Sequence, residues 1–164
     1  MIVLGIDPGP ETHGAVVYDT EERRAVWAEG RVSSADLRDV LENDLDKITA
    51  VVIERPAAMG PMGAGKVGHM LDTAWAGGEL AAACRGLGLQ VHTMTRREVL
   101  RGLGVLSGSG SSDARVRAAC IADHGGNKAA AVGRKATPGP LYGVSSHAWQ
   151  ALGLVLAWLE VRGA

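Results

Sequence analysis

The sequence contains no phenylalanine and only two cysteines, Cys84 and Cys120, among 164 residues. These cysteines lack the spacing of a zinc or redox motif, so we expect reduced thiols in a cytoplasmic protein. No apolar stretch is long enough to span a bilayer, and we expect no signal peptide before the first apolar run. These absences argue against a membrane protein and against a secreted scaffold held by disulfides.

A large net charge is also missing, because the formal total is −1. The charges are unevenly distributed, however. Residues 1–54 contain 5 Lys/Arg and 12 Asp/Glu, a net charge of −7, and residues 55–164 contain 12 and 6, a net charge of +6. Such an asymmetry suits a protein that presents one cationic face to a polyanion, although chance clustering of solvated charges explains it equally well.

Two acidic residues each end an apolar run. Asp7 ends Met-Ile-Val-Leu-Gly-Ile-Asp, and Glu54 ends Ile-Thr-Ala-Val-Val-Ile-Glu. If these runs are parallel neighbouring strands, the two carboxylates meet at one sheet edge and repel each other unless a cation lies between them. The pattern predicts a divalent-metal site and metal-assisted phosphodiester cleavage. The alternatives are a turn at Asp7 before Pro-Gly, and for Glu54 an ion pair with Arg55 or a solvated strand end.

The apolar periodicity predicts one α/β domain over residues 1–164, with an irregular stretch at 125–144. Strands alternate with helices after an initial meander, which predicts an RNase H-like fold: a mixed five-stranded sheet with helices on both faces. Strands are expected at 2–7, 14–19, 24–32, 48–54 and 89–94, and helices after Ser33 or Ser34, over 68–86, after Thr95, after Ser112 and over 146–161.

Four segments resemble the RuvC family of Holliday junction resolvases. They are Gly-Ile-Asp-Pro-Gly at 5–9, Val-Val-Ile-Glu at 51–54, Ser-Asp-Ala-Arg-Val at 112–116 and Ser-His-Ala-Trp-Gln-Ala-Leu at 146–152. The first also looks like the phosphate-binding strand of actin-like kinases, but the chain is too short for two such domains. The resemblance implies a homodimer that binds four-way DNA junctions and nicks two strands with Mg²⁺ or Mn²⁺.

The resemblance also implies a set of site residues. Asp7 and Glu54 fall on the first two carboxylates of the family, and the last helix adds His147 and Gln150, three apart and therefore on one helical face. In such a site Asp7 bridges two ions, Glu54 binds one of them, and His147 and Gln150 complete the other or orient the attacking water.

Gln150 departs from the family, which has an acid at this position. An amide offers a carbonyl oxygen but no charge, so metal affinity should be lower. Gln150 is either natural with weakened activity, or an engineered replacement of Glu, or outside the site because another acid completes it. Asp113 and Asp123 are the spare acids, in a helix that we expect to lie away from the site.

Candidate DNA-binding residues come from three segments: a glycine-rich loop at 56–67, the helix after Thr95 and the stretch 125–144. Methionines in the loop suit insertion between bases, and the basic residues suit phosphate contacts. A plain surface loop and ordinary solvated charge are the alternatives. The candidates are Met59, Met62, Lys66, Arg96, Arg97, Arg101, Lys128, Arg134 and Lys135.

Two other functions remain open. The same fold also suits a nuclease that trims structured RNA. A catalytically weak junction-binding protein is the other possibility, because Gln150 carries no charge.

Overall fold

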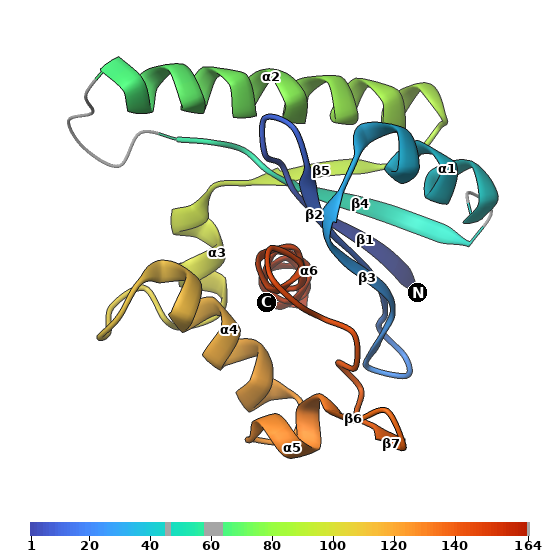
Figure 1. The fold of residues 1–164 in the computed structure, drawn as a ribbon, viewed down its shortest axis with the longest axis vertical. Helices are drawn as coiled ribbons and strands as arrows, with labels where there is room; N and C mark the ends of the chain where they lie inside the picture. Colours follow the sequence, from blue (N-terminus) through green and yellow to red (C-terminus); the bar gives the residue numbers. More distant parts are fainter. Residues whose placement is uncertain (45–46, 58–63, 164) are drawn as a thin grey trace.

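The computed structural model describes residues 1–44, 47–57 and 64–163. Its main feature is a five-stranded mixed sheet in the order β3-β2-β1-β4-β5 (Figure 1). β1 is antiparallel to β2 and parallel to β4, and the predicted mixed five-stranded sheet is therefore confirmed. The strands are β1 (Ile2–Asp7), β2 (His13–Asp19), β3 (Arg24–Val32), β4 (Ile48–Glu54) and β5 (Val91–Met94).

β1 is the central strand, and its composition follows from that position. A strand with neighbours on both sides and helices on both faces needs an almost continuous apolar run. Val3 packs in the core layer on one face, and Leu4 and Ile6 pack in the layer on the other. Polar residues are therefore confined to the end of the strand, where Asp7 lies.

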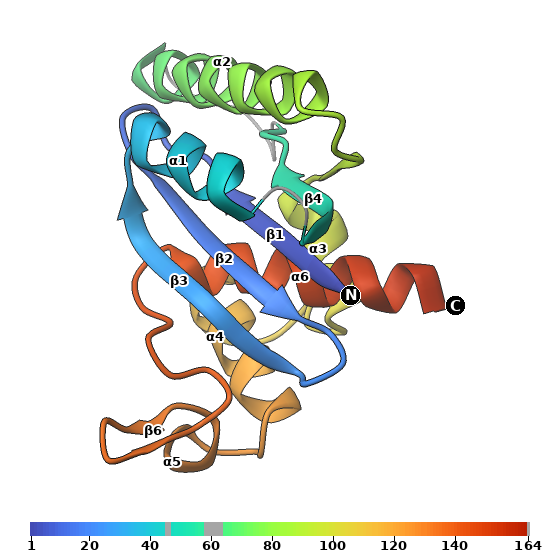
Figure 2. The same cartoon turned by 90° about the vertical axis from the view of Figure 1, so that its right-hand side faces the viewer.

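Helices cover both faces of the sheet (Figure 2). α1 (Ser34–Asp44) and α2 (Ala64–Gly86) lie on one face. α6 (Ala148–Gly163) packs against the other, between the sheet and the two helices α3 (Arg96–Gly102) and α4 (Ser112–Asp123). Because α6 is surrounded, every residue from Ala148 to Trp158 is buried.

α6 lies unusually close to β1 because the strand carries glycine at the crossing. A Cβ atom added at Gly5 would lie 2.3 Å from the carbonyl oxygen of Ala151 and 2.8 Å from Val155 Cγ2. Gly5 therefore sets the distance between the central strand and the central helix.

Several helix boundaries differ from the sequence prediction. α2 begins at Ala64 rather than near residue 68, and the side chain that caps α4 belongs to Ser111 rather than Ser112. α6 begins at Ala148, because Ser146 has a φ of 46° and lies outside helical geometry.

The stretch 125–144, predicted to be irregular, contains regular structure. It forms the short helix α5 (Lys128–Ala131) and a hairpin of β6 (Gly133–Arg134) and β7 (Thr137–Pro138). Asn127 starts the helix, since its side chain accepts a hydrogen bond from the backbone N–H of Ala130 at 3.0 Å. Both elements are too short to produce a periodic sequence pattern.

Cys84 and Cys120 are both buried and unpaired, in separate core layers. In the described part of the chain, no helix is long and apolar enough to cross a membrane.

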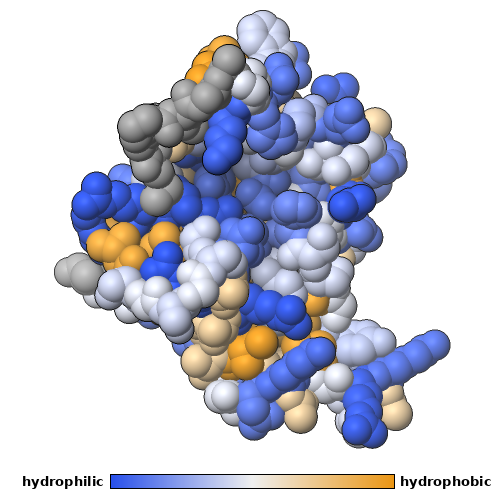
Figure 3. All heavy atoms as spheres, turned by 60° about the vertical axis from the view of Figure 1, so that its left-hand side comes forward, coloured by the Kyte–Doolittle hydropathy of each residue, from blue (hydrophilic) through white to orange (hydrophobic). Residues whose placement is uncertain are grey.

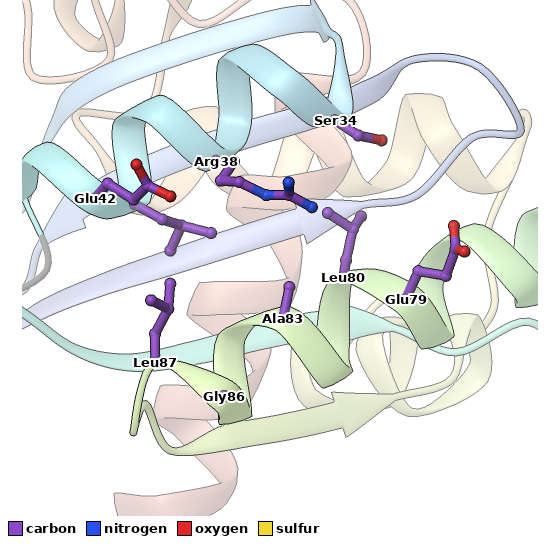
Figure 4. A pocket seen from close by; sticks show the side chains of 9 residues that line it. Ser34, Arg38, Glu42, Glu79, Leu80, Ala83, Gly86 and Leu87 are labelled. Atoms are coloured by element: carbon purple, nitrogen blue, oxygen red, sulfur yellow. The ribbon is translucent and has the colours of Figure 1, made fainter.

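The space between α1 and α2 forms a hollow of about 330 Å³ (Figure 4). Leu41, Leu80 and Leu87 line it, together with Arg38 from α1 and Glu79 from α2. It shares no lining residue with the acidic edge of the sheet described next.

Candidate functional site

The site begins at the ends of two neighbouring parallel strands. Asp7 is the last residue of β1 and Glu54 is the last residue of β4, and the preceding residues Ile6 and Ile53 pair across the ladder. The parallel pairing expected from the sequence is confirmed. The side chains of Asp7 and Glu54 are only 12% and 13% exposed, so the two carboxylates share a mostly buried edge of the sheet.

His147 and Gln150 approach this edge at the start of α6. The backbone carbonyl of His147 accepts a hydrogen bond from the N–H of Gln150 at 3.0 Å. His147 Nδ1 lies 3.3 Å from Asp7 Oδ2, whereas Gln150 is buried. Gly14 makes this approach possible, because a Cβ atom there would lie 2.4 Å from the His147 carbonyl. The structure thus places the two residues beside Asp7.

Arg96 lies inside the acid cluster rather than on the surface. Its Nη2 atom is 3.1 Å from Glu54 Oε2 and 4.0 Å from Asp7 Oδ1, and its Nη1 atom donates a hydrogen bond to Gln150 Oε1. The side chain is 18% exposed. The sequence predicts Arg96 only as a contact for DNA phosphates. In this structure its guanidinium contacts Glu54 and Gln150 of the site.

Asp113 also belongs to the cluster, and the expectation that it lies away from the site is wrong. Its Oδ1 atom is 3.7 Å from Arg96 Nη2, and its backbone carbonyl lies 3.5 Å from Gln150 Nε2, which donates to it. The reason is that α4 packs against α6, and the first turns of the two helices lie beside each other. Asp123, at the other end of α4, instead pairs with Arg23 at 2.9 Å.

Burial controls the electrostatics of the two strand-end acids. It raises the pKa of Glu54 to about 7, and Arg96 offsets only part of this effect. Burial also raises the pKa of Asp7 above its ordinary value, against the lowering effects of Arg96 and His147. Among the described residues, Glu54 Oε2 has no hydrogen-bond partner despite its nearness to Arg96. The cluster is therefore short of positive charge when both acids are ionised.

This donor set fits a hard divalent cation in its chemistry. Carboxylate and amide oxygens are the ligands that Mg²⁺ takes, and an imidazole suits Mn²⁺ as well. Over residues 1–44, 47–57 and 64–163, no three His, Cys, Asp or Glu side chains converge closely enough to form a ready cation cage. Arg96 lies between the acids at this point.

Two adjacent hollows open on the cluster, with volumes of about 420 and 560 Å³. Both are lined by Asp7, Arg96 and His69. His69 has no signal in the sequence as a site residue, since its place depends on how α2 lies across the strand ends. Lys66, one of the DNA-binding candidates, lines the larger of the two hollows. Hydrophilic residues occupy much of the middle of the face shown in Figure 3.

The other described DNA-binding candidates do not line these two hollows. Arg97 and Arg101 are exposed on α3, and Arg101 lines a separate hollow with His92 and Trp158. Lys128 lies in α5, and Arg134 and Lys135 lie in or beside the β6–β7 hairpin, at the end of the molecule opposite α2 (Figures 1 and 2). All three are exposed. Met59 and Met62 lie outside the described residues.

The raised pKa of Glu54 predicts a pH-dependent stability of the metal-free protein. A carboxyl whose pKa rises from 4.5 to about 7 on folding binds more protons folded than unfolded between these values. The free energy of unfolding therefore falls as the pH rises through this window, by up to about 3 kcal/mol from this group. Glu54→Gln should lose this part of the pH dependence and melt higher than the wild type at pH 8. Thermal melts in a chelator at several pH values measure it, and parallel profiles would contradict the expectation.

Two solved structures share this fold over nearly the whole chain. Thermus thermophilus RuvC in complex with a Holliday junction substrate is 20% identical, with a TM-score of 0.64 and coverage of 99% of this chain and 95% of that one. A second Thermus thermophilus RuvC structure is 21% identical, with a TM-score of 0.61 and coverage of 99% and 96%. No family model matches the sequence, and no curated protein matches it. The chain has the RNase H-like α/β fold of RuvC Holliday junction resolvase structures.

Proposed function

We propose that this chain is a divalent-metal-dependent endonuclease that nicks branched DNA, above all four-way junctions, as a homodimer. The observation that carries the proposal is the pair of buried carboxylates, Asp7 and Glu54, at adjacent ends of parallel strands. Support also comes from the fold, which is shared with a RuvC solved on a Holliday junction substrate.

Asp7 and Glu54 would hold Mg²⁺ or Mn²⁺, together with oxygen or nitrogen from Gln150 or His147. A divalent ion bound there supplies Lewis-acid stabilisation of phosphate charge and a water of lowered pKa. The protein's own part is to orient the side chains that would hold the ion. Asp7 fixes the imidazole of His147 through its Oδ2 atom, 3.3 Å from Nδ1, and this leaves the second ring nitrogen to hold a proton or a water.

A weakly catalytic junction-binding protein is the second candidate. Gln150 favours it, because this side chain carries no charge and its Oε1 atom already accepts a hydrogen bond from Arg96. A ligand position that is neutral and occupied lowers metal affinity without affecting contacts with DNA phosphates.

The assay that separates these functions uses one set of labelled substrates: a four-way DNA junction, the matching linear duplex and a structured RNA. The nuclease proposal predicts nicking of the junction in Mg²⁺ or Mn²⁺ and none in a chelator. Tight junction binding without nicking in either metal supports the binding protein instead. Preferential cleavage of the RNA would overturn the choice of substrate.

The homodimer is supported by an exposed apolar face on α2, the helix that lies along the outer edge of the molecule in Figure 1. Leu71 is 59% exposed and Trp75 is 73% exposed, and Gly78 follows on the same face three residues later. Two copies of such a face can pack together about a two-fold axis, and the small residue allows close approach. Two sites in one dimer then suit a substrate with two strands to cut.

This surface yields a prediction about assembly. Trp75→Asp should convert the dimer to a monomer, because an aspartate cannot be buried in an apolar interface without a partner. Val26→Asp is the matched control, since Val26 is also exposed, at 52%, but lies on β3. Light scattering coupled to gel filtration gives the mass. A dimeric Trp75→Asp would place the interface elsewhere.

A further inference from the structure

We propose that Arg96 takes the place of one cation in the acid cluster, so that this site binds one divalent ion where the two-ion scheme has two. This inference rests on the proposed metal-dependent function. Its starting point is that a guanidinium of the chain itself already lies among the acids.

The contacts of Arg96 are those expected of a cation that balances the cluster. One nitrogen, Nη2, lies within 4.0 Å of a carboxylate oxygen on each of Asp7, Glu54 and Asp113. The other, Nη1, donates to Gln150 Oε1. These four side chains come from β1, β4, α4 and α6, so Arg96 is their common neighbour.

Arg96 is held by the fold. It is the first residue of α3, after the N-cap Thr95, whose side chain accepts a hydrogen bond from the N–H of Glu98. The carboxylate of Glu98 accepts in return from the N–H of Thr95 at 2.7 Å. Val99 and Leu100 of α3 are buried, and Gly102 lets that helix approach Ala157 of α6 closely. The backbone from which the guanidinium extends is therefore fixed relative to the acids.

The charge balance favours one ion. Asp7, Glu54 and Asp113 carry three negative charges when ionised, and Arg96 leaves two, which one divalent ion neutralises. A second ion would have to bind beside the guanidinium, and the three described acids within 4.0 Å of Arg96 are already counted in this balance. Gln150, the neutral residue at the position where the family has an acid, accepts from Arg96 instead. The arginine and the glutamine therefore act in the same direction, because each lowers the negative charge that would hold a second ion.

The contacts also indicate which side is left for the ion. Arg96 reaches Asp7 through Oδ1, whereas His147 lies 3.3 Å from Oδ2. The side of Asp7 that faces His147 is thus the one free of Arg96. On the other side the guanidinium offers a fixed positive charge and N–H donors to a phosphate in the adjoining hollows, which it lines.

The test counts bound Mn²⁺ on the full chain without DNA, by calorimetry and by the EPR signal of free Mn²⁺. Wild type should bind one ion at a site lost in Asp7→Asn. Gln150→Glu should still bind one, since the new carboxylate pairs with Arg96. The double variant Gln150→Glu/Arg96→Gln should bind two, and Gln150→Glu/Arg85→Gln, which removes an exposed arginine of α2, should bind one.

Two ions on wild type or on Gln150→Glu, both lost in Asp7→Asn, would overturn the role of Arg96 and leave the metal-dependent function intact. One ion on a folded Gln150→Glu/Arg96→Gln would also overturn it. Circular dichroism checks folding, and Arg96→Met, which keeps the aliphatic stem, replaces Arg96→Gln in the double variant if that protein is unfolded. If wild type binds no Mn²⁺, or binds it as well as Asp7→Asn does, the result contradicts the proposed function itself.

Discussion

We expect Asp7→Asn to lower the proposed rate of four-way junction nicking by about 10³-fold or more, and to leave junction affinity within about threefold of wild type. The reason is local. Asp7 lies on the central strand, between Arg96 and His147. It is the acid shared by the Arg96 guanidinium and the one proposed divalent ion. Asparagine keeps the shape of the side chain but removes the charge that holds a cation. Single-turnover nicking in Mg²⁺ and in Mn²⁺ measures the first quantity, and gel-shift titration in a chelator measures the second.

The matched control for this variant is Asp39→Asn, the same substitution on an exposed residue of α1. It should nick at the wild-type rate. Equal activity of Asp7→Asn and wild type would falsify the proposed mechanism. A loss of binding that parallels the loss of nicking would show that Asp7 acts on DNA affinity instead.

Gly5→Ala should lower the free energy of unfolding by about 3 kcal/mol and the melting temperature by roughly 10 °C. The added methyl would lie 2.3 Å from the carbonyl oxygen of Ala151 and 2.8 Å from Val155 Cγ2. The nearest atom belongs to the backbone of the most buried helix, so no side-chain rotation relieves the contact. β1 and α6 must move apart, and the packing contacts between them weaken.

Gly86→Ala is the control for this stability change, because a Cβ atom there meets nothing within 4 Å. It should melt at or slightly above the wild-type temperature, since alanine favours a helix over glycine. Chemical denaturation of the three proteins gives the comparison. An unchanged midpoint for Gly5→Ala would mean that α6 is less tightly fixed to the sheet than the close contact implies.

The sequence predicts the strand-end acids well because the signal is local. Asp7 and Glu54 each follow a run that only a buried strand explains, and the helical crossover between those strands implies parallel pairing. The last helix is also predicted from the apolar pattern of its segment, over 146–161. Its boundary is misplaced by two residues because Ser146 adopts a positive φ, which no pattern of apolar residues records.

Arg96 and Asp113 could not be placed in this way. The capping box at Thr95 locates Arg96 at a helix start, but a long side chain can point to solvent or inward from that position. Asp113 enters the site only because α4 and α6 begin at the same end of the molecule. That arrangement depends on packing, including the fit of Val116 against Gly153, where a Cβ atom would lie 2.3 Å from the valine methyl. Contacts between distant segments carry no periodic signature.

The central position of α6 has a consequence for biosynthesis. The helix that β1, β2, α3 and α4 pack against comes after all of them in the sequence. A nascent chain therefore cannot close this half of the core until residues up to about 158 have left the ribosome, since Leu152, Leu154 and Val155 are among the buried residues that complete it. Such long-range contacts slow folding and leave apolar strand surface exposed meanwhile. His147 and Gln150 join the acids only at this last step, so translation of the preceding segments leaves the acid cluster incomplete.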